Sequence, residues 1–115
     1  MSRSLKLYCN DILISCDKVL RYTQGLDDNS FFADELRFDA VIRNLLVIGE
    51  AVKQIPPEIR NKYPHIKCRK IAGLRDILVR AYFSLEDDII WDINIIQTKI
   101  SPLRSAILII ISQEF

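Results

Sequence analysis

Apolar residues recur every three or four positions along most of the chain, which is the spacing of one face of an α-helix. The first such segment runs over 5–20, and the glycine and the aspartates within 25–29 end it. The spacing returns over 38–52, and the two prolines Pro56 and Pro57 stop it. Pro57 can open a short helix, because the N–H that proline lacks would be unpaired at the first helical position.

The second half of the chain repeats the helical spacing, interrupted by cap signals. We expect a long helix over 67–83, after the break at Pro64. Residues 84–87 read Ser-x-x-Asp, which resembles a capping box and restarts a helix. Ser101 and Pro102 resemble an N-cap followed by a first-turn proline, so the final helix is expected to begin or kink there.

These elements predict an all-α fold, a small antiparallel bundle of four to five helices in one domain that spans residues 1–115. Propensity alone favours strands for the isoleucine-rich C-terminal segments, but their apolar spacing is helical and their flanks carry helix caps. The final helix is apolar almost all round. It is either buried in its own bundle, or its outer face meets another chain. A chain this small is also stabilised by dimerisation, which favours a homodimer.

Composition excludes several classes of protein. Half of the residues are hydrophobic and 27% are charged, which is typical of a globular domain and not of a disordered chain. Three cysteines are too few, and odd in number, for a disulfide-stapled secreted domain. We expect no metal and no cofactor, because the candidate zinc ligands lack the paired short spacings of a zinc site. These candidates are Cys9, Cys16, His65 and Cys68.

Nothing in the sequence marks export or membrane insertion. The N-terminal segment lacks the apolar stretch of a signal peptide. The most apolar run covers 106–111, far short of the roughly 18–20 residues that span a bilayer. We therefore expect a cytoplasmic protein with reduced thiols.

The net charge of +1 conceals an uneven distribution. Residues 1–50 carry six basic and eight acidic side chains, and residues 84–115 carry two basic and five acidic ones. The middle of the chain, 51–83, carries eight basic and only two acidic side chains. Tyr63 and Tyr82 are interleaved with this basic block. Basic residues among aromatic ones favour a phosphate backbone and stacked bases, although such a segment can also be a solvated face. The RNA-binding candidates are Lys67, Arg69 and Lys70.

Arg75 and Tyr82 are the best candidates for chemistry. They are seven residues apart, which places them on nearly the same face of a helix, two turns from each other. An arginine binds a phosphate with two hydrogen bonds, and a tyrosine hydroxyl can bond a further oxygen or accept a modifying group. In the alternative interpretation, Arg75 flanks the core and Tyr82 packs its ring with its hydroxyl in water.

A series of short strings, in this order and spacing, resembles the HepT-type HEPN family, the toxin half of two-gene toxin–antitoxin modules. The strings cover residues 7–8, 11–12, 32–34, 39–45, 48–51, 57–60, 63–64, 71–78, 82–83 and 90–93. The resemblance implies a helical dimer that acts as a metal-independent ribonuclease on RNA such as tRNA, with its site at the dimer cleft. The family signature is Arg, four to six residues, His, any residue, Tyr. Arg75 and Tyr82 match it, but Arg80 occupies the position of the histidine.

This departure falls on the catalytic position. Histidine exchanges protons because its pKa lies near about 6.5, whereas an arginine keeps its proton at neutral pH. We therefore expect the chain to bind RNA but to cleave it weakly or not at all. Arg80 can also pair with Asp76, one turn back. The histidine at position 65, ten residues before Arg75, is not placed at the site by its spacing. Arg80 is either natural or introduced, and the sequence leaves both open.

The resemblance also implies a partner and supporting residues. The family's antitoxin is a small nucleotidyltransferase that transfers AMP to the motif tyrosine, which corresponds to Tyr82. Asn44 and Glu50 match further family strings and are candidates to support the site, or else form a bundle hydrogen bond and a surface acid. Two other functions stay open: a non-catalytic module that binds RNA or the antitoxin, and a structural dimer without RNA contact.

Overall fold

The computed structural model describes residues 4–64 and 93–115. Within these ranges every regular element is a helix, which confirms the all-α fold. The helices are α1 (Leu5–Thr23), α2 (Asp28–Ala33), α3 (Glu35–Lys53), α4 (Pro57–Lys62) and α6 (Ile93–Glu114). The helices expected over 67–83 and after Ser84 lie outside the described residues.

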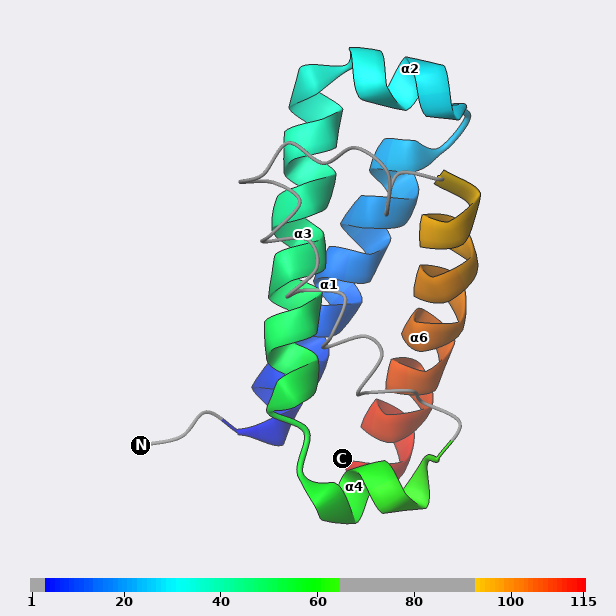
Figure 1. Cartoon of the computed structure of the whole chain (residues 1–115). Helices are drawn as coiled ribbons and strands as arrows, with labels where there is room; N and C mark the ends of the chain where they lie inside the picture. The colour runs from blue at the N-terminus through cyan, green and yellow to red at the C-terminus, as the bar shows by residue number, and fades with distance from the viewer. Residues whose placement is uncertain (1–3, 65–92) are drawn as a thin grey trace.

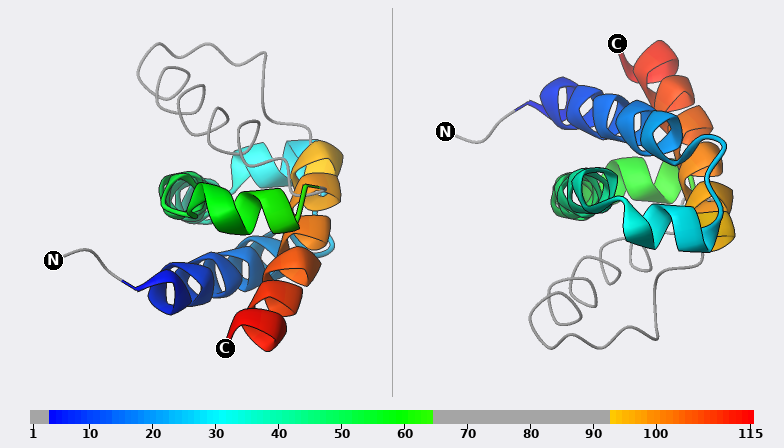
Figure 2. Two further views of the ribbon diagram at one scale, coloured as in Figure 1. Left: turned by 90° about the horizontal axis from the view of Figure 1, so that it is seen from below. Right: turned by 90° about the horizontal axis from the view of Figure 1, so that it is seen from above.

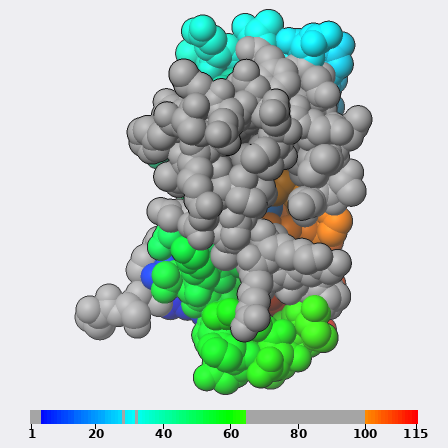
Figure 3. Space-filling view, viewed as in Figure 1, coloured from blue at the N-terminus to red at the C-terminus, as the bar shows by residue number. Residues whose placement is uncertain are grey.

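Three long helices form the body of the molecule, and two short ones lie at its ends (Figure 1). α1 packs against both α3 and α6 and runs antiparallel to them. α2 connects α1 to α3 at one end of the bundle, and α4 follows α3 at the other end. The space-filling view in Figure 3 shows α2 and α4 at these opposite ends. The antiparallel arrangement of α1 and α3 agrees with the predicted bundle.

Side-chain caps define where the helices begin. The side chains of Ser4, Asp27 and Asp34 accept hydrogen bonds from backbone N–H groups in the first turns of α1, α2 and α3, respectively. α1 ends before Gly25, whose φ of 75° lies in the left-handed region that glycine adopts readily. Pro57 opens α4 at its first position, as predicted. The short segment between α1 and α3 forms the helix α2.

The core lies between α1, α3 and α6 and is built from the predicted apolar stripes. Fully buried members include Ile12, Ile48 and Ile107, one from each long helix. Cys9 and Cys16 are also buried and pack as small core residues. Burial raises the pKa of the Cys9 thiol to about 11 and that of the Cys16 thiol to about 12. Both thiols are therefore protonated and unreactive at neutral pH.

Of the two outcomes expected at Pro102, a start or a kink of the final helix, the start is wrong. α6 runs from Ile93 to Glu114 and includes Pro102 in its interior. Proline removes one backbone hydrogen bond there, at a cost of about 3 kcal/mol relative to alanine. Burial of apolar residues on both sides of the proline offsets this cost and holds the helix together. These residues are Ile100, Leu103, Ala106, Ile107 and Ile110.

The outer face of α6 is not covered by the described part of the bundle. Leu108 and Ile109 are 40% and 42% exposed, whereas Ile107 and Ile110 are buried. Along the described residues, every helix is too short or too polar to cross a membrane.

Candidate functional site

The central residues of the predicted site lie outside the described residues. Position 64 ends one described range and position 93 opens the next, so the whole signature from Arg75 to Tyr82 falls between them. The same holds for the other candidates of this segment, namely His65, Lys67, Arg69, Lys70 and Asp76. The structure describes the helices on either side of this segment, together with Asn44 and Glu50.

Asn44 lies in the middle of α3 and is only 5% exposed. Its side-chain amide donates to the backbone carbonyl of Ala40 at 2.7 Å, one turn earlier in the same helix. A buried amide group is costly unless it is bonded, and this contact satisfies part of that requirement. The contact also fixes the orientation of the side chain.

Glu50 lies on a different face of α3 from Asn44. Six residues at 3.6 per turn place the two side chains about 120° apart around the helix, and Glu50 is exposed where Asn44 is buried. The structure therefore does not bring these two candidates together. A role for either in supporting the site stays a prediction.

The end of α4 carries contacts that the sequence did not reveal. The Tyr63 hydroxyl donates to Oε1 of Gln113 at 2.6 Å, and Lys62 Nζ lies 3.1 Å from Oε1 of Glu114. Tyr63 is itself only 6% exposed. Burial, together with the Glu114 carboxylate, raises the pKa of the Tyr63 phenol. These contacts attach the end of α4 to the C-terminal turn of α6. The segment that carries the signature follows the end of α4 in the sequence.

These contacts change the interpretation of the basic block. Tyr63 is one of the aromatic residues interleaved with the basic block, but its ring belongs to the hydrophobic core and is not free to stack on bases. Lys62 forms an ion pair within the chain, and Arg60 Nε donates to the backbone carbonyl of Ile55 at 2.8 Å. The start of the block thus stabilises the fold. Helical periodicity is read from short windows of sequence, so it could not have identified contacts between residues about 50 positions apart.

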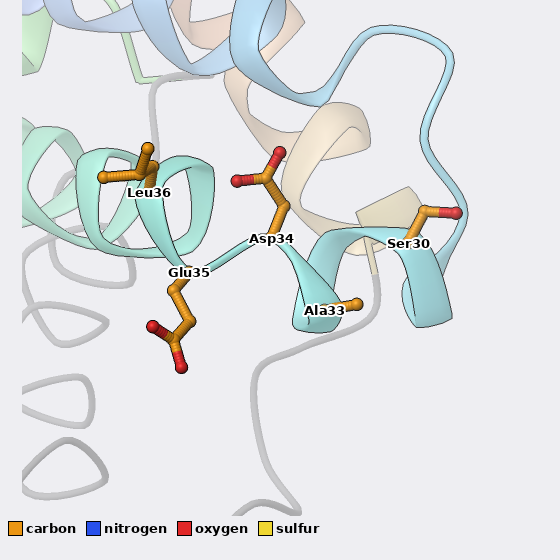
Figure 4. A pocket seen from close by; sticks show the side chains of 5 residues that line it. All are labelled: Ser30, Ala33, Asp34, Glu35 and Leu36. Atoms are coloured by element: carbon orange, nitrogen blue, oxygen red, sulfur yellow. The ribbon is translucent and has the colours of Figure 1, made fainter.

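Two surface hollows share Leu36 in their lining, one between α2 and the start of α3 and the other between α1 and α3. The first is shown in Figure 4 and is lined by Ser30, Ala33, Asp34, Glu35 and Leu36. The second is lined by Arg21, Tyr22, Leu36, Arg37 and Ala40. Of the site residues predicted from the sequence, the structure describes Asn44 and Glu50, and neither lines a hollow. Among residues 4–64 and 93–115, no cluster of three or more His, Cys, Asp or Glu side chains offers a metal-binding set.

Comparison with known proteins identifies relatives over nearly the whole chain. A protein from Methanocaldococcus jannaschii, named as a candidate RNase, is 42% identical over 90 residues, which is 78% of each chain. The "Probable ribonuclease HepT" of Thermococcus cleftensis is 35% identical over 109 residues, which covers 90% of this chain and 99% of that one. No solved structure matches the chain.

A further relative from M. jannaschii is longer. Its name combines a gamma-glutamylcyclotransferase with a candidate RNase, and it is 37% identical over 113 residues. The match covers 98% of this chain but only half of that relative. The family model described as "Ribonuclease HepT-like" matches residues 12–110, from the middle of α1 to the penultimate turn of α6. The chain therefore belongs to the HepT-like ribonuclease family.

Proposed function

We propose that the chain is the toxin of a HEPN/MNT toxin–antitoxin system, a metal-independent ribonuclease fold that binds RNA such as tRNA and cleaves it weakly or not at all. The observation that carries this proposal is the family match over residues 12–110, which includes the signature positions Arg75, Arg80 and Tyr82. We further propose that the chain is a single cytoplasmic domain and functions as a homodimer, with the RNA in the dimer cleft.

The reaction requires two proton transfers. Cleavage of RNA without a metal removes a proton from a 2′-hydroxyl group and gives one to the leaving oxygen. Arg80 holds its proton at neutral pH and cannot accept the first one. The loss of general acid–base catalysis typically lowers a rate by about 10²–10⁴. Arg80 still attracts phosphate, so binding is retained where cleavage is lost.

The other signature residues bind and orient the RNA. Arg75 holds the phosphate, Tyr82 orients the scissile group, and Asp76 pairs with Arg80. Lys67, Arg69 and Lys70 contact the neighbouring backbone phosphates. Asn44 supports the site from α3, where its buried amide is already fixed by the Ala40 carbonyl. Glu50 contributes an exposed carboxylate from the same helix.

RNA binding is tested by titration of the chain with tRNA at several salt concentrations. We expect the affinity to fall as salt rises, with a slope that reports several phosphate contacts. The Arg75→Ala chain should bind more weakly and with a smaller slope. Binding that is absent, or independent of salt, would exclude the proposed function and favour a structural dimer without RNA contact.

A second function is favoured by Arg80 itself, because a chain that cannot cleave RNA can still serve as a partner of the antitoxin. In this proposal a nucleotidyltransferase transfers AMP from ATP to Tyr82. The phenol oxygen forms a bond to the α-phosphorus, and pyrophosphate leaves. The bulk and negative charge of the AMP then exclude RNA from the cleft.

Incubation with ATP and a nucleotidyltransferase antitoxin of a HEPN/MNT module, followed by mass spectrometry, tests this second function. We expect the mass of the chain to rise by one AMP unit, and the Tyr82→Phe chain to remain unmodified. Unchanged mass of the unaltered chain would contradict the transfer.

A further inference from the structure

Two arginines from different helices contact Tyr22, the last residue but one of α1. Arg21 Nη2 lies 3.5 Å from the Tyr22 hydroxyl, and the guanidinium carbon of Arg21 lies 5.2 Å from the centre of the Tyr22 ring. Arg37, from α3, donates from Nη1 to the backbone carbonyl of Tyr22 at 3.1 Å. The right-hand view of Figure 2 looks down on this end of the bundle, where α1 ends and α3 begins. The packing of two helices therefore gathers two positive charges around one tyrosine.

These three residues line the surface hollow between α1 and α3, which is called here the Tyr22 hollow. Its other lining residues, Leu36 and Ala40, are apolar. The hollow has a volume of about 430 Å³, and ligand sites in proteins typically have about 300–1,000 Å³. Leu36 is 86% exposed, more than any other large apolar side chain of the described residues. The hollow thus offers two guanidinium groups, an aromatic ring and an uncovered apolar side chain within the space of one small ligand.

The Tyr22 hollow has an excess of positive charge. Its lining contains two arginines and no acidic side chain. Asp34, which lies 3.2 Å from Nε of Arg37, lines the neighbouring hollow instead. Arg21 is exposed and has no ion pair with a described residue. Since like charges held close together repel each other, an anion between the two guanidinium groups would relieve this repulsion.

Contacts within the chain orient both guanidinium groups and use only some of their N–H donors. Arg37 uses Nε toward Asp34 and Nη1 toward the Tyr22 carbonyl, so its Nη2 remains. Arg21 contacts Tyr22 through Nη2, so its Nε and Nη1 remain. The N–H groups of a guanidinium lie in one plane and bind phosphate oxygens in pairs. Because both side chains are already oriented, the entropy cost of binding a phosphate is reduced.

We propose that the Tyr22 hollow binds one nucleotide unit, with its phosphate on Arg21 and Arg37 and its base against Leu36 and Ala40. A base has the planar apolar face that covers an exposed leucine and stacks on a guanidinium plane or an aromatic ring. A carboxylate can pair with the arginines but leaves the apolar part of the hollow uncovered. The nucleotide unit belongs either to an RNA strand or to a free mononucleotide. In the RNA strand it adds a contact outside the signature, and only in that form does the inference rest on the RNA binding of the proposed function.

NMR titration of the full chain, observed at the Leu36 methyl groups, tests the site itself. The Leu36→Ala chain identifies these signals by their absence. We expect the signals to shift, and the shift to saturate, on addition of a four-nucleotide RNA or of AMP. A shift with the RNA alone assigns the hollow to a strand, and a shift with AMP alone assigns it to a free nucleotide. No shift with either, or an equal shift with a glutamate peptide of the same charge, overturns the inference.

Matched variants on α1 test the role of the arginine. Arg21→Ala should weaken the nucleotide affinity measured at Leu36 about tenfold, because charged hydrogen bonds are lost. Arg21→Lys should restore only part of the affinity, since lysine keeps the charge but not the planar donors. Lys6→Ala removes the same charge from the same helix, about 22 Å along its axis from Arg21, and Lys6 lines neither hollow. Equal losses for Arg21→Ala and Lys6→Ala would show a general effect of charge and overturn the site.

Comparison with Arg75→Ala separates this inference from the proposed function. If tRNA binding falls with Arg75→Ala while the Leu36 signals respond to neither RNA nor AMP, the proposed function stands and the inference is wrong. If the Leu36 signals respond to AMP in a chain that does not bind tRNA, the nucleotide site stands and the RNA-binding function is excluded. Circular dichroism of every variant confirms that the chain stays helical.

Discussion

The Tyr63 hydroxyl lies 2.6 Å from Oε1 of Gln113, across 50 positions of the sequence. This contact joins the end of α4 to the last turn of α6, and the Tyr63 ring is buried in the core. The adjacent ion pair between Lys62 and Glu114 is more exposed, with 59% of the lysine side chain accessible. The end of α4 is therefore fixed mainly by the tyrosine.

Replacing Tyr63 by phenylalanine should lower the free energy of unfolding by about 1 kcal/mol, because the ring stays buried and only the hydrogen bond is lost. Urea unfolding of the two chains measures this difference. Lys62→Met is the control, and an exposed ion pair contributes about 0–1 kcal/mol. A larger loss for Lys62→Met than for Tyr63→Phe would contradict this assignment of roles.

Pro102→Ala should stabilise the chain by about 1–2 kcal/mol. Alanine restores the backbone hydrogen bond inside α6, which stabilises the folded chain. Alanine also makes the unfolded chain more flexible than proline does, and this effect cancels only part of that stabilisation. Pro57→Ala is the matched control, since the proline at the first position of α4 breaks no helical bond. Urea unfolding should show a gain for position 102 and none for position 57. Equal effects at the two positions would argue against a continuous α6.

The buried thiols should resist alkylation in the folded chain. Cys9 and Cys16 are both fully buried, and burial holds their pKa values at about 11 and about 12. In a Cys68→Ser chain at pH 8, iodoacetamide should therefore label neither thiol until urea unfolds the protein. Mass spectrometry after timed labelling provides the measurement. Rapid labelling without urea would show that α1 does not pack as described.

Alkaline pH should destabilise the fold. The pKa values of the Cys9 and Cys16 thiols and of the Tyr63 phenol are raised in the folded chain, so the unfolded chain loses these protons first. The pKa values in the unfolded chain are about 9 for the thiols and about 10 for the phenol. Below these values the three groups contribute their full stabilisation to the folded chain, and this stabilisation is lost as the pH rises through the folded pKa values. Thermal unfolding between pH 8 and pH 11 should show a falling midpoint. The triple variant Cys9→Ala, Cys16→Ala, Tyr63→Phe should show a smaller fall.

Apolar spacing and helix-cap residues predict the described helices well, but they carry no information on contacts between residues far apart in the sequence. Gly25 and Pro57 marked helix boundaries correctly, because backbone geometry acts within a few residues. Pro102 does not start the final helix, because the burial of apolar residues on both sides of it outweighs the local helix-breaking effect of proline. The Tyr63–Gln113 contact and the hollow between α1 and α3 arise only when separate helices meet. Asn44 was found by family resemblance, but its bond to Ala40 required the structure.

Position 80 carries the central claim, because the chain belongs to the HepT-like family while the residue at the position of the family's histidine is an arginine. The most direct measurement compares tRNA cleavage by the unaltered chain with cleavage by Arg80→His, in the presence of a metal chelator. Arg75→Ala in the Arg80→His chain controls for contaminating nuclease. We expect Arg80→His to cleave about 10²–10⁴ times faster than the unaltered chain. Cleavage by the unaltered chain at the same rate as Arg80→His would contradict the account.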